Sequence, residues 1–190
     1  MTSPIVIPED APFSPQQRVW LSDFLGKLLS GTGAPSGPAV PVTILFGSQT
    51  GNAEGLAKKL VKTLKKGNFE PEVHDIGAYD RSRLAQEKNL LVITSTYGDG
   101  EPPDNAASLH SALMAAEGNI LEGVQFSVFA LGDSNYPAFC QCGKDFDAKL
   151  EALGATRVAP RVDGDADFDA PFATWSESLL GSLALEPANA

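Results

Sequence analysis

The chain has 190 residues, of which 43% are hydrophobic and 20% are charged, so its composition is that of a globular protein with a core and excludes a disordered or fibrous chain. Its formal net charge of −10 argues against a nucleic-acid partner and suits a basic protein partner, although acidity alone does not establish one. No apolar stretch reaches the ~20 residues of a bilayer span, and the N-terminus lacks the pattern of a signal peptide. We therefore expect a cytoplasmic protein with no membrane partner.

The first 41 residues differ in pattern from the rest of the chain. A Ser-Pro pair at 14–15 is typical of a helix start and predicts a helix over 15–29. Apolar residues recur along it at helical spacing and predict one stripe, formed by Val19, Trp20, Phe24, Leu25, Leu28 and Leu29. The Gly-, Pro- and Ser-rich stretch 30–41 predicts a flexible linker. We expect an N-terminal extension over 1–41 and one domain over 42–186.

The domain alternates strand-like and helix-like segments. Strands are predicted at 42–46, 70–76, 89–95, 124–132 and 156–162. Helical segments are predicted over 52–66, 80–87, 105–117, 141–153 and 169–184, with Asp104 as the N-cap of the third. This alternation predicts an α/β fold, in which helices cover both faces of a five-stranded parallel sheet. Because ligands bind beyond the carboxyl ends of such strands, we expect the loops after the first, third and fourth strands to form one site.

The loop after the first strand, GSQTGNA at 47–53, has the composition of a phosphate site. It matches neither the Walker loop nor the dinucleotide fingerprint, and it contains no Lys or Arg. Backbone N–H groups at a helix N-terminus, with hydroxyl and amide side chains, suit a terminal monophosphate better than a triphosphate. Taken alone, the loop is also compatible with an ordinary helix cap.

The other two loops each carry a tyrosine. Tyr97 lies in STYGDGEPPDN (95–105), and Tyr136 lies in LGDSNYPAFC (131–140). Either one alone is compatible with an ordinary surface aromatic. Two tyrosines on neighbouring loops can hold a planar ring between them, with ~1 kcal/mol from each stacking contact. Together, the three loops predict a site for a phosphorylated planar heterocycle, with flavin mononucleotide (FMN) as the leading candidate.

These motifs resemble those of a known family. FGSQTGNAE, STYGDGEPPDNA and ALGDSNYPAFCQCGKDFDAKLEALGA are similar to the FMN-binding, flavodoxin-like domain of the diflavin reductases. The stretch FCQCGKDFDAKLEALGATRVAPRVDGDADF is most similar to the sulfite reductase flavoprotein (alpha) branch. The resemblance covers roughly 42–183, and it implies a flavodoxin-like fold with strand order 2-1-3-4-5 and FMN as cofactor.

The resemblance also implies which residues bind FMN. The phosphate is assigned to Ser48, Gln49, Thr50, Gly51, Asn52 and Ala53, and one side of the ring to Ser95, Thr96, Tyr97 and Gly98. The other side is assigned to Leu131, Gly132, Asp133, Ser134, Asn135, Tyr136, Pro137, Ala138, Phe139 and Cys140, and Asp163 matches a position near the flavin. No side chain is expected to act as a catalytic acid or base.

In the resembling family, electrons pass from NADPH to FAD to FMN and then to an acceptor, which in the sulfite branch is a siroheme and iron–sulfur hemoprotein. The FAD and NADPH modules are absent from this chain, so we expect it to work with a reductase module in cis or in trans, as part of an NADPH-dependent oxidoreductase. Alone, it would be an electron carrier. Acidic residues around the expected flavin edge are either a docking surface for a basic partner or a merely solvated rim: Asp99, Glu101, Asp104 and Asp133.

Two alternatives stay open at this point. A free-standing flavodoxin serving other acceptors has similar loops. A non-redox binding module on the same fold is disfavoured, because Gly47 and Ser48 stand where a phosphoacceptor Asp would end the first strand. No metal site is expected, since the calcium-like stretch DGDADFD (163–169) has Phe168 where the loop needs glycine. We expect the C-x-C pair at 140–142 to be reduced, structural thiols.

Overall fold

The computed structural model describes residues 7, 13, 17, 18, 20–22, 24, 25 and 39–183. Residues 17, 18, 20–22, 24 and 25 have helical backbone, and the rings of Trp20 and Phe24 stack with their centroids 5.1 Å apart. The rest of the predicted helix over 15–29 lies outside the described residues, including Val19, Leu28 and Leu29. Among the described residues, no helix has both the length and the apolar character needed to cross a membrane.

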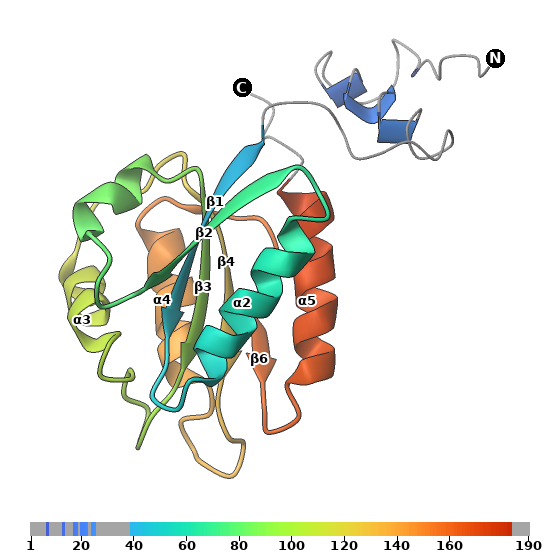
Figure 1. Ribbon diagram of the computed structural model, residues 1–190. Coiled ribbons are helices and arrows are strands. Elements are labelled where there is room, and N and C mark those ends of the chain that lie inside the picture. Colours follow the sequence, from blue (N-terminus) through green and yellow to red (C-terminus); the bar gives the residue numbers. More distant parts are fainter. Residues whose placement is uncertain are drawn as a thin grey trace.

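Residues 39–183 alternate strands and helices. The strands are β1 (Val40–Gly47), β2 (Phe69–Asp75), β3 (Asn89–Ser95), β4 (Gln125–Leu131), β5 (Thr156–Arg157) and β6 (Val162–Gly164). The helices are α2 (Asn52–Leu64), the 3-10 helix η1 (Arg81–Gln86), α3 (Ala107–Ala115), α4 (Gln141–Ala152) and α5 (Asp169–Ser182). All strands pair in parallel, in the order β2-β1-β3-β4-β5, with β6 also beside β4 (Figure 1). The predicted strand order is confirmed.

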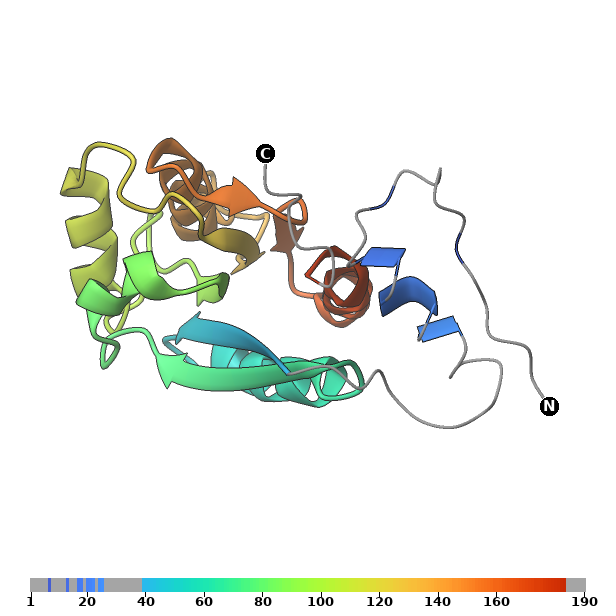
Figure 2. The ribbon, with the colours of Figure 1, turned by 90° about the horizontal axis from the view of Figure 1, so that it is seen from above.

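Two hydrophobic cores lie on the two faces of this sheet. Residues such as Val128 and Phe146 pack one face against α3 and α4, and residues such as Phe129 and Trp175 pack the other against α2 and α5. Figures 1 and 2 show this arrangement, with α2 and α5 side by side on one face. Strands β3 and β4 are buried on both faces, which is why their sequences do not alternate cleanly between apolar and polar residues.

Residues 156–162, predicted as one strand, form two short strands instead. Both pair with β4, and the four residues between them belong to no strand, although the N–H of Val158 still donates to the Phe126 carbonyl at 2.9 Å. Pro160 has no N–H to donate there. The Ala159 carbonyl accepts a hydrogen bond from the Ser127 hydroxyl (3.1 Å), which itself accepts one from Trp175 Nε1 (2.8 Å). The prediction of a continuous strand is therefore wrong, although its two parts lie at the predicted side of the sheet.

A nearly buried carboxylate, that of Asp147 in α4, joins this helix to the split strand. The Asp147 side chain is 8% exposed. Arg157 donates to both of its oxygens, at 2.8 and 3.0 Å, and Arg161 donates to one of them at 3.0 Å. Arg157 also pairs with Glu151, and Arg161 pairs with Asp163. One carboxylate thus holds both arginines of the segment that ends in β6.

Helix α4 also approaches β4 very closely at Gly143. A Cβ added at Gly143 would lie 2.2 Å from the Cβ of Ala130, so only glycine allows this contact. The close approach fixes the start of α4, and with it the preceding loop, against the sheet.

Candidate functional site at the carboxyl edge of the sheet

Three loops meet at one edge of the sheet because β1, β3 and β4 are parallel and in register. Gly47 lies beside Thr94, and Ser95 lies beside Leu131. The loops after these strands therefore leave the sheet at the same end, the lower end in Figure 1. This is the edge at which a doubly wound sheet binds ligands.

The first loop leads into an uncapped helix. Gly51, the N-cap of α2, has a φ of 89°, a left-handed conformation that favours glycine, and no side chain among the described residues caps the helix. The Ser48 hydroxyl accepts the N–H of Gly51 at 2.9 Å, which curls the loop. The first N–H groups of a helix have no acceptor within the helix. The N–H groups of Asn52 and Ala53 are therefore suitably placed to bind an anion.

Asn105 and Asp104, just before α3, hold this loop in place. The N–H of Ser48 donates to Asn105 Oδ1 at 3.0 Å, and Gln49 exchanges two hydrogen bonds with Asp104, both of 3.2 Å. Asn105 Nδ2 also donates to the carbonyl of Phe46 at 3.4 Å. A single amide side chain therefore connects the end of β1, the first loop and the second loop.

The role of Asn105 was missed by the sequence reasoning, which treated Asp104 as the N-cap of the third helix. That prediction is wrong: α3 begins at Ala107, and no side chain of the described residues caps it. Pairing with Gln49 turns the Asp104 side chain toward the first loop instead. One feature of the sequence could have identified Asn105: it is an amide residue at the end of the second loop, shortly after Pro102 and Pro103.

The second loop makes a tight turn that exposes Tyr97. Tyr97 and Glu101 pair through two backbone hydrogen bonds, of 2.8 and 2.9 Å. Gly98, inside this turn, has a φ of 52°, and a Cβ added there would lie 2.5 Å from the Glu101 carboxylate. The N–H of Thr96 donates to the Leu131 carbonyl at 2.9 Å, which joins this loop to the next. The Tyr97 ring is left 56% exposed at the edge of the sheet.

The third loop exposes Tyr136, which is 58% accessible. Asp133 Oδ1 accepts hydrogen bonds from the Asn135 backbone (2.9 Å) and side chain (2.7 Å). The hydroxyl and the N–H of Ser134 both donate to Asp165, and these bonds lower the pKa of the Asp165 carboxyl. Asp165 follows β6 and was also missed, because its partner is far away in the sequence.

The less exposed residues at the two ends of the third loop contact β6. The N–H of Gly132 donates to the Gly164 carbonyl at 3.0 Å, and the Cys140 thiol contacts the same carbonyl at 3.7 Å. Burial, reinforced by the charge of Asp163, raises the pKa of Cys140 to about 12, and burial raises the pKa of Cys142 to about 11. Both thiols are therefore protonated at neutral pH, as expected for structural cysteines.

Asp163 lies on β6, opposite Ala130 of β4. Its carboxylate accepts hydrogen bonds from Arg161 at 2.7 and 3.4 Å, and it is on the face of the sheet that α4 covers. This ion pair engages the Asp163 side chain within the protein. Its role near a flavin stays a prediction.

The predicted site residues fall into three groups by exposure. The exposed ones are Gln49, Thr50, Gly51, Asn52, Tyr97, Gly98, Asp133, Ser134, Asn135, Tyr136 and Pro137. The half-buried ones are Ser48, Ser95, Thr96, Gly132, Ala138, Phe139 and Asp163, and the buried ones are Ala53, Leu131 and Cys140. The exposed group can contact a ligand through side chains, whereas the buried group can support the loops from below.

The residues at this edge of the sheet suit a ligand that combines an anionic group with a flat apolar ring. The first loop offers backbone N–H and neutral polar donors without a cation. A Cβ added at Gly51 would contact nothing within 4 Å, so there is space in front of the loop. Within the part of the chain that the structure describes, no cluster of His, Cys, Asp or Glu is arranged to hold a metal ion. The two exposed tyrosine rings belong to the neighbouring loops.

Comparison with known proteins agrees with this description. The family model described as Flavodoxin matches residues 44–175. A flavodoxin of Streptococcus pneumonia TIGR4 has a similar structure, with a TM-score of 0.68 and 28% identity over 76% of this chain and 98% of that one. A short-chain flavodoxin associated with a PDU bacterial microcompartment, 23% identical, shares the fold with a TM-score of 0.65.

The chain is also similar to part of several longer proteins. The sulfite reductase [NADPH] flavoprotein alpha-component of Bacillus subtilis (strain 168) is 44% identical over 181 residues, which cover 88% of this chain and 30% of the relative. The component of the same name from Cronobacter sakazakii is 40% identical, over 90% of this chain and 30% of the relative. The chain thus spans about 30% of the length of these relatives.

Proposed function

The chain belongs to the flavodoxin family, and on this basis we propose that it binds FMN and carries electrons as one domain of an NADPH-dependent sulfite reductase flavoprotein. The observation that carries the proposal is the uncapped N-terminus of α2, reached by a loop without cations, at the same edge as Tyr97 and Tyr136. A cofactor with one phosphate and one flat ring uses all three features.

Each loop has its own task in this proposal. The N–H groups at the start of α2 bind the phosphate, together with the side chains of Ser48, Gln49, Thr50 and Asn52. Tyr97 and Tyr136 stack against the two faces of the ring and limit its contact with water. Thr96, hydrogen-bonded to Leu131, sets the spacing between the two tyrosine loops. When bound, FMN supplies reversible one- and two-electron chemistry at its ring.

We further propose that the electrons come from an FAD- and NADPH-binding reductase module, in cis or in trans, and go to a siroheme hemoprotein. The support is the 40–44% identity to the sulfite reductase flavoprotein components. The exposed carboxylates near the tyrosines form an acidic rim that suits a basic partner: Asp99, Glu101, Asp104 and Asp133. A cytoplasmic location and a cofactor domain over 42–186 are part of the same proposal.

Stopped-flow mixing tests the direction of this electron flow. The FMN-loaded chain, reduced by NADPH through a reductase module, should pass electrons to the siroheme hemoprotein, at a rate that falls as salt screens the acidic rim. A chain that accepts electrons but never reduces the hemoprotein would contradict the choice of acceptor.

A free-standing flavodoxin is the second candidate, because the Streptococcus pneumonia flavodoxin aligns with this chain over 98% of its own length. The two candidates differ in their donor. A chain that is reduced equally well by unrelated flavodoxin reductases, and that shows no preference for a sulfite reductase module, would favour the free-standing carrier.

Replacing Asn105 with alanine should weaken FMN binding about tenfold, because the phosphate loop loses the side chain that accepts the N–H of Ser48. Titration by flavin fluorescence measures the change. Asn119→Ala, at an exposed position between α3 and β4 and outside the three loops of the site, is the matched control and should leave FMN affinity unchanged. Unaltered affinity in Asn105→Ala would show that Asn105 does not support the phosphate loop.

A further inference from the structure

Helix α2 and the turn that follows it carry a concentration of positive charge that the proposed function does not use. Within the nine residues 58–66 lie five of the chain's 14 lysines and arginines: Lys58, Lys59, Lys62, Lys65 and Lys66. All five are exposed, in a chain whose net charge is −10. We name these five residues the lysine ridge.

Ion pairs within the protein neutralise only part of the positive charge of the ridge. Lys58 pairs with Glu54 at 2.5 Å and Lys59 with Asp169 at 2.8 Å, and both pairs are exposed, so they contribute little to stability. The other three have no ion pair with the described residues: Lys62, Lys65 and Lys66. The second half of α2 and the turn after it therefore present positive charge that no ion pair with the described residues neutralises.

The needs of the helix itself do not explain the ridge. Cations near a helix C-terminus interact favourably with its dipole, but this effect fades beyond the last turn and does not reach Lys58 or Lys59. Within the helix, Lys62 stands four residues from Lys58, and like charges at this spacing destabilise a helix. The helix itself therefore gives no reason for the positive charge to extend back to Lys58 and Lys59, which points to a use outside the fold.

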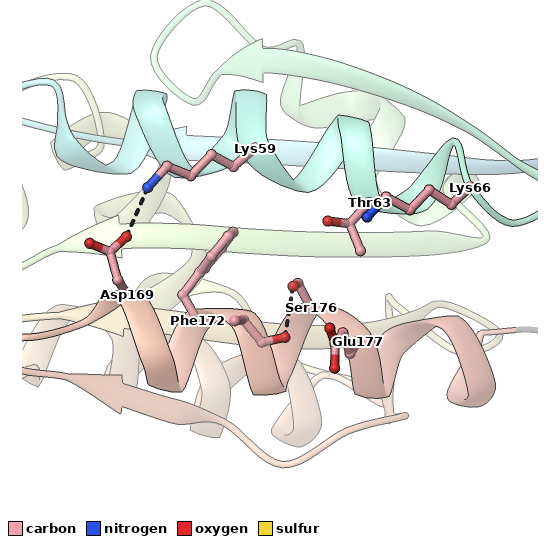
Figure 3. A pocket seen from close by; sticks show the side chains of 8 residues that line it. Lys59, Thr63, Lys66, Asp169, Phe172, Ser176 and Glu177 are labelled. Carbon is pink, nitrogen blue, oxygen red and sulfur yellow. Dashed lines mark hydrogen bonds and ion pairs between the residues drawn. The ribbon is translucent and has the colours of Figure 1, made fainter.

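Between α2 and α5 the ridge borders a groove of about 280 Å³ (Figure 3). Lys59 lines it from α2 and Lys66 from the turn after α2, whereas Asp169 and Glu177 line it from α5. The groove itself therefore carries both signs of charge. The other three lysines of the ridge do not line the groove: Lys58, Lys62 and Lys65.

The ridge is separated from the proposed flavin edge. Helix α2 starts at the phosphate loop and runs away from it, and a helix rises 1.5 Å per residue. Lys62 thus lies roughly 15 Å along the helix axis from Asn52. The lysine ridge and the edge with Tyr97 and Tyr136 are therefore separate parts of the surface.

We propose that the lysine ridge is a docking surface for a protein partner with an acidic surface. Charge complementarity selects this partner, since the acidic rim at the flavin edge repels it and the ridge attracts it. The chain thus has two docking surfaces of opposite sign. A partner held at the ridge stays bound while another protein approaches the flavin edge.

A poly-L-glutamate peptide is a suitable probe, with binding measured by isothermal titration calorimetry at low salt. The ridge variant is K62E/K66E, and the matched control is R81E/K88E, which makes the same change in net charge at positions outside α2. We expect the ridge variant to bind the peptide at least about tenfold more weakly than the parent. The control variant should bind nearly as the parent does. Added salt should weaken binding. Chain stripped of FMN should give the same result, so this test is independent of the cofactor.

Three outcomes would overturn the proposal. The first is no binding of the peptide even at low salt. The second is an equal loss of affinity in both variants, which would mean that net charge alone matters. The third is tighter binding of a single-stranded oligonucleotide with the same number of charges, which would indicate a nucleic-acid surface instead.

Discussion

Replacing Thr50 with aspartate should lower the affinity for FMN at least about a hundredfold while leaving the affinity for riboflavin nearly unchanged. Thr50 is exposed in the proposed phosphate loop, which contains no cation. If this loop binds the phosphate, a carboxylate at position 50 repels the phosphate dianion, and a repulsion of about 3 kcal/mol corresponds to this change in affinity. Riboflavin has the same ring but no phosphate, so it does not meet this repulsion. Parallel fluorescence titrations with the two flavins measure the difference.

Two controls separate this effect from damage to the fold. Ser111→Asp adds the same charge at an exposed position on α3, and should leave both affinities unchanged. An acidic residue near the start of α2 is favourable for the helix, so the Thr50→Asp protein should remain folded. Equal losses for FMN and riboflavin would show that the loop does not bind the phosphate.

Replacing Asp147 with alanine should lower the free energy of unfolding by about 3 kcal/mol, because it leaves two arginines partly buried without their shared carboxylate. The estimate lies at the low end for a broken buried pair, since Arg157 keeps Glu151 and Arg161 keeps Asp163. Denaturant unfolding of the purified protein measures the change.

Asp167→Ala is the matched control for this prediction. Asp167 is an exposed carboxylate in the loop after β6, and its removal should change the free energy of unfolding by less than about 0.5 kcal/mol. If Asp147→Ala unfolds at the same denaturant concentration as the parent, the Asp147 network is not a stabilising element.

Most of the architecture could be predicted from local patterns. The run NLLVITS predicted β3 at its observed bounds, because a strand buried on both faces needs a continuous apolar sequence. The helices followed from their periodicity within a few residues. The meeting of the three loops followed from the parallel sheet, since parallel strands end at the same edge.

The failures share a physical cause, which is contact between residues far apart in the sequence. Asn105 binds Ser48 across 57 positions, and Asp165 binds Ser134 across 31, so no local pattern identifies either residue. At the split in the last strand, the Ala159 carbonyl accepts a hydrogen bond from Ser127, 32 positions away, although the neighbouring Pro160 was a local signal. Asp163 was assigned by resemblance alone; its carboxylate accepts a hydrogen bond from Arg161, and its role near a flavin stays a prediction.

A titration of the purified, flavin-free chain with FMN and, separately, with riboflavin tests the proposed cofactor site as a whole. We expect one FMN bound per chain, with strong quenching of its fluorescence by the stacked tyrosines and with much tighter binding than riboflavin. FMN that does not bind, or that binds no more tightly than riboflavin, would contradict the proposed site.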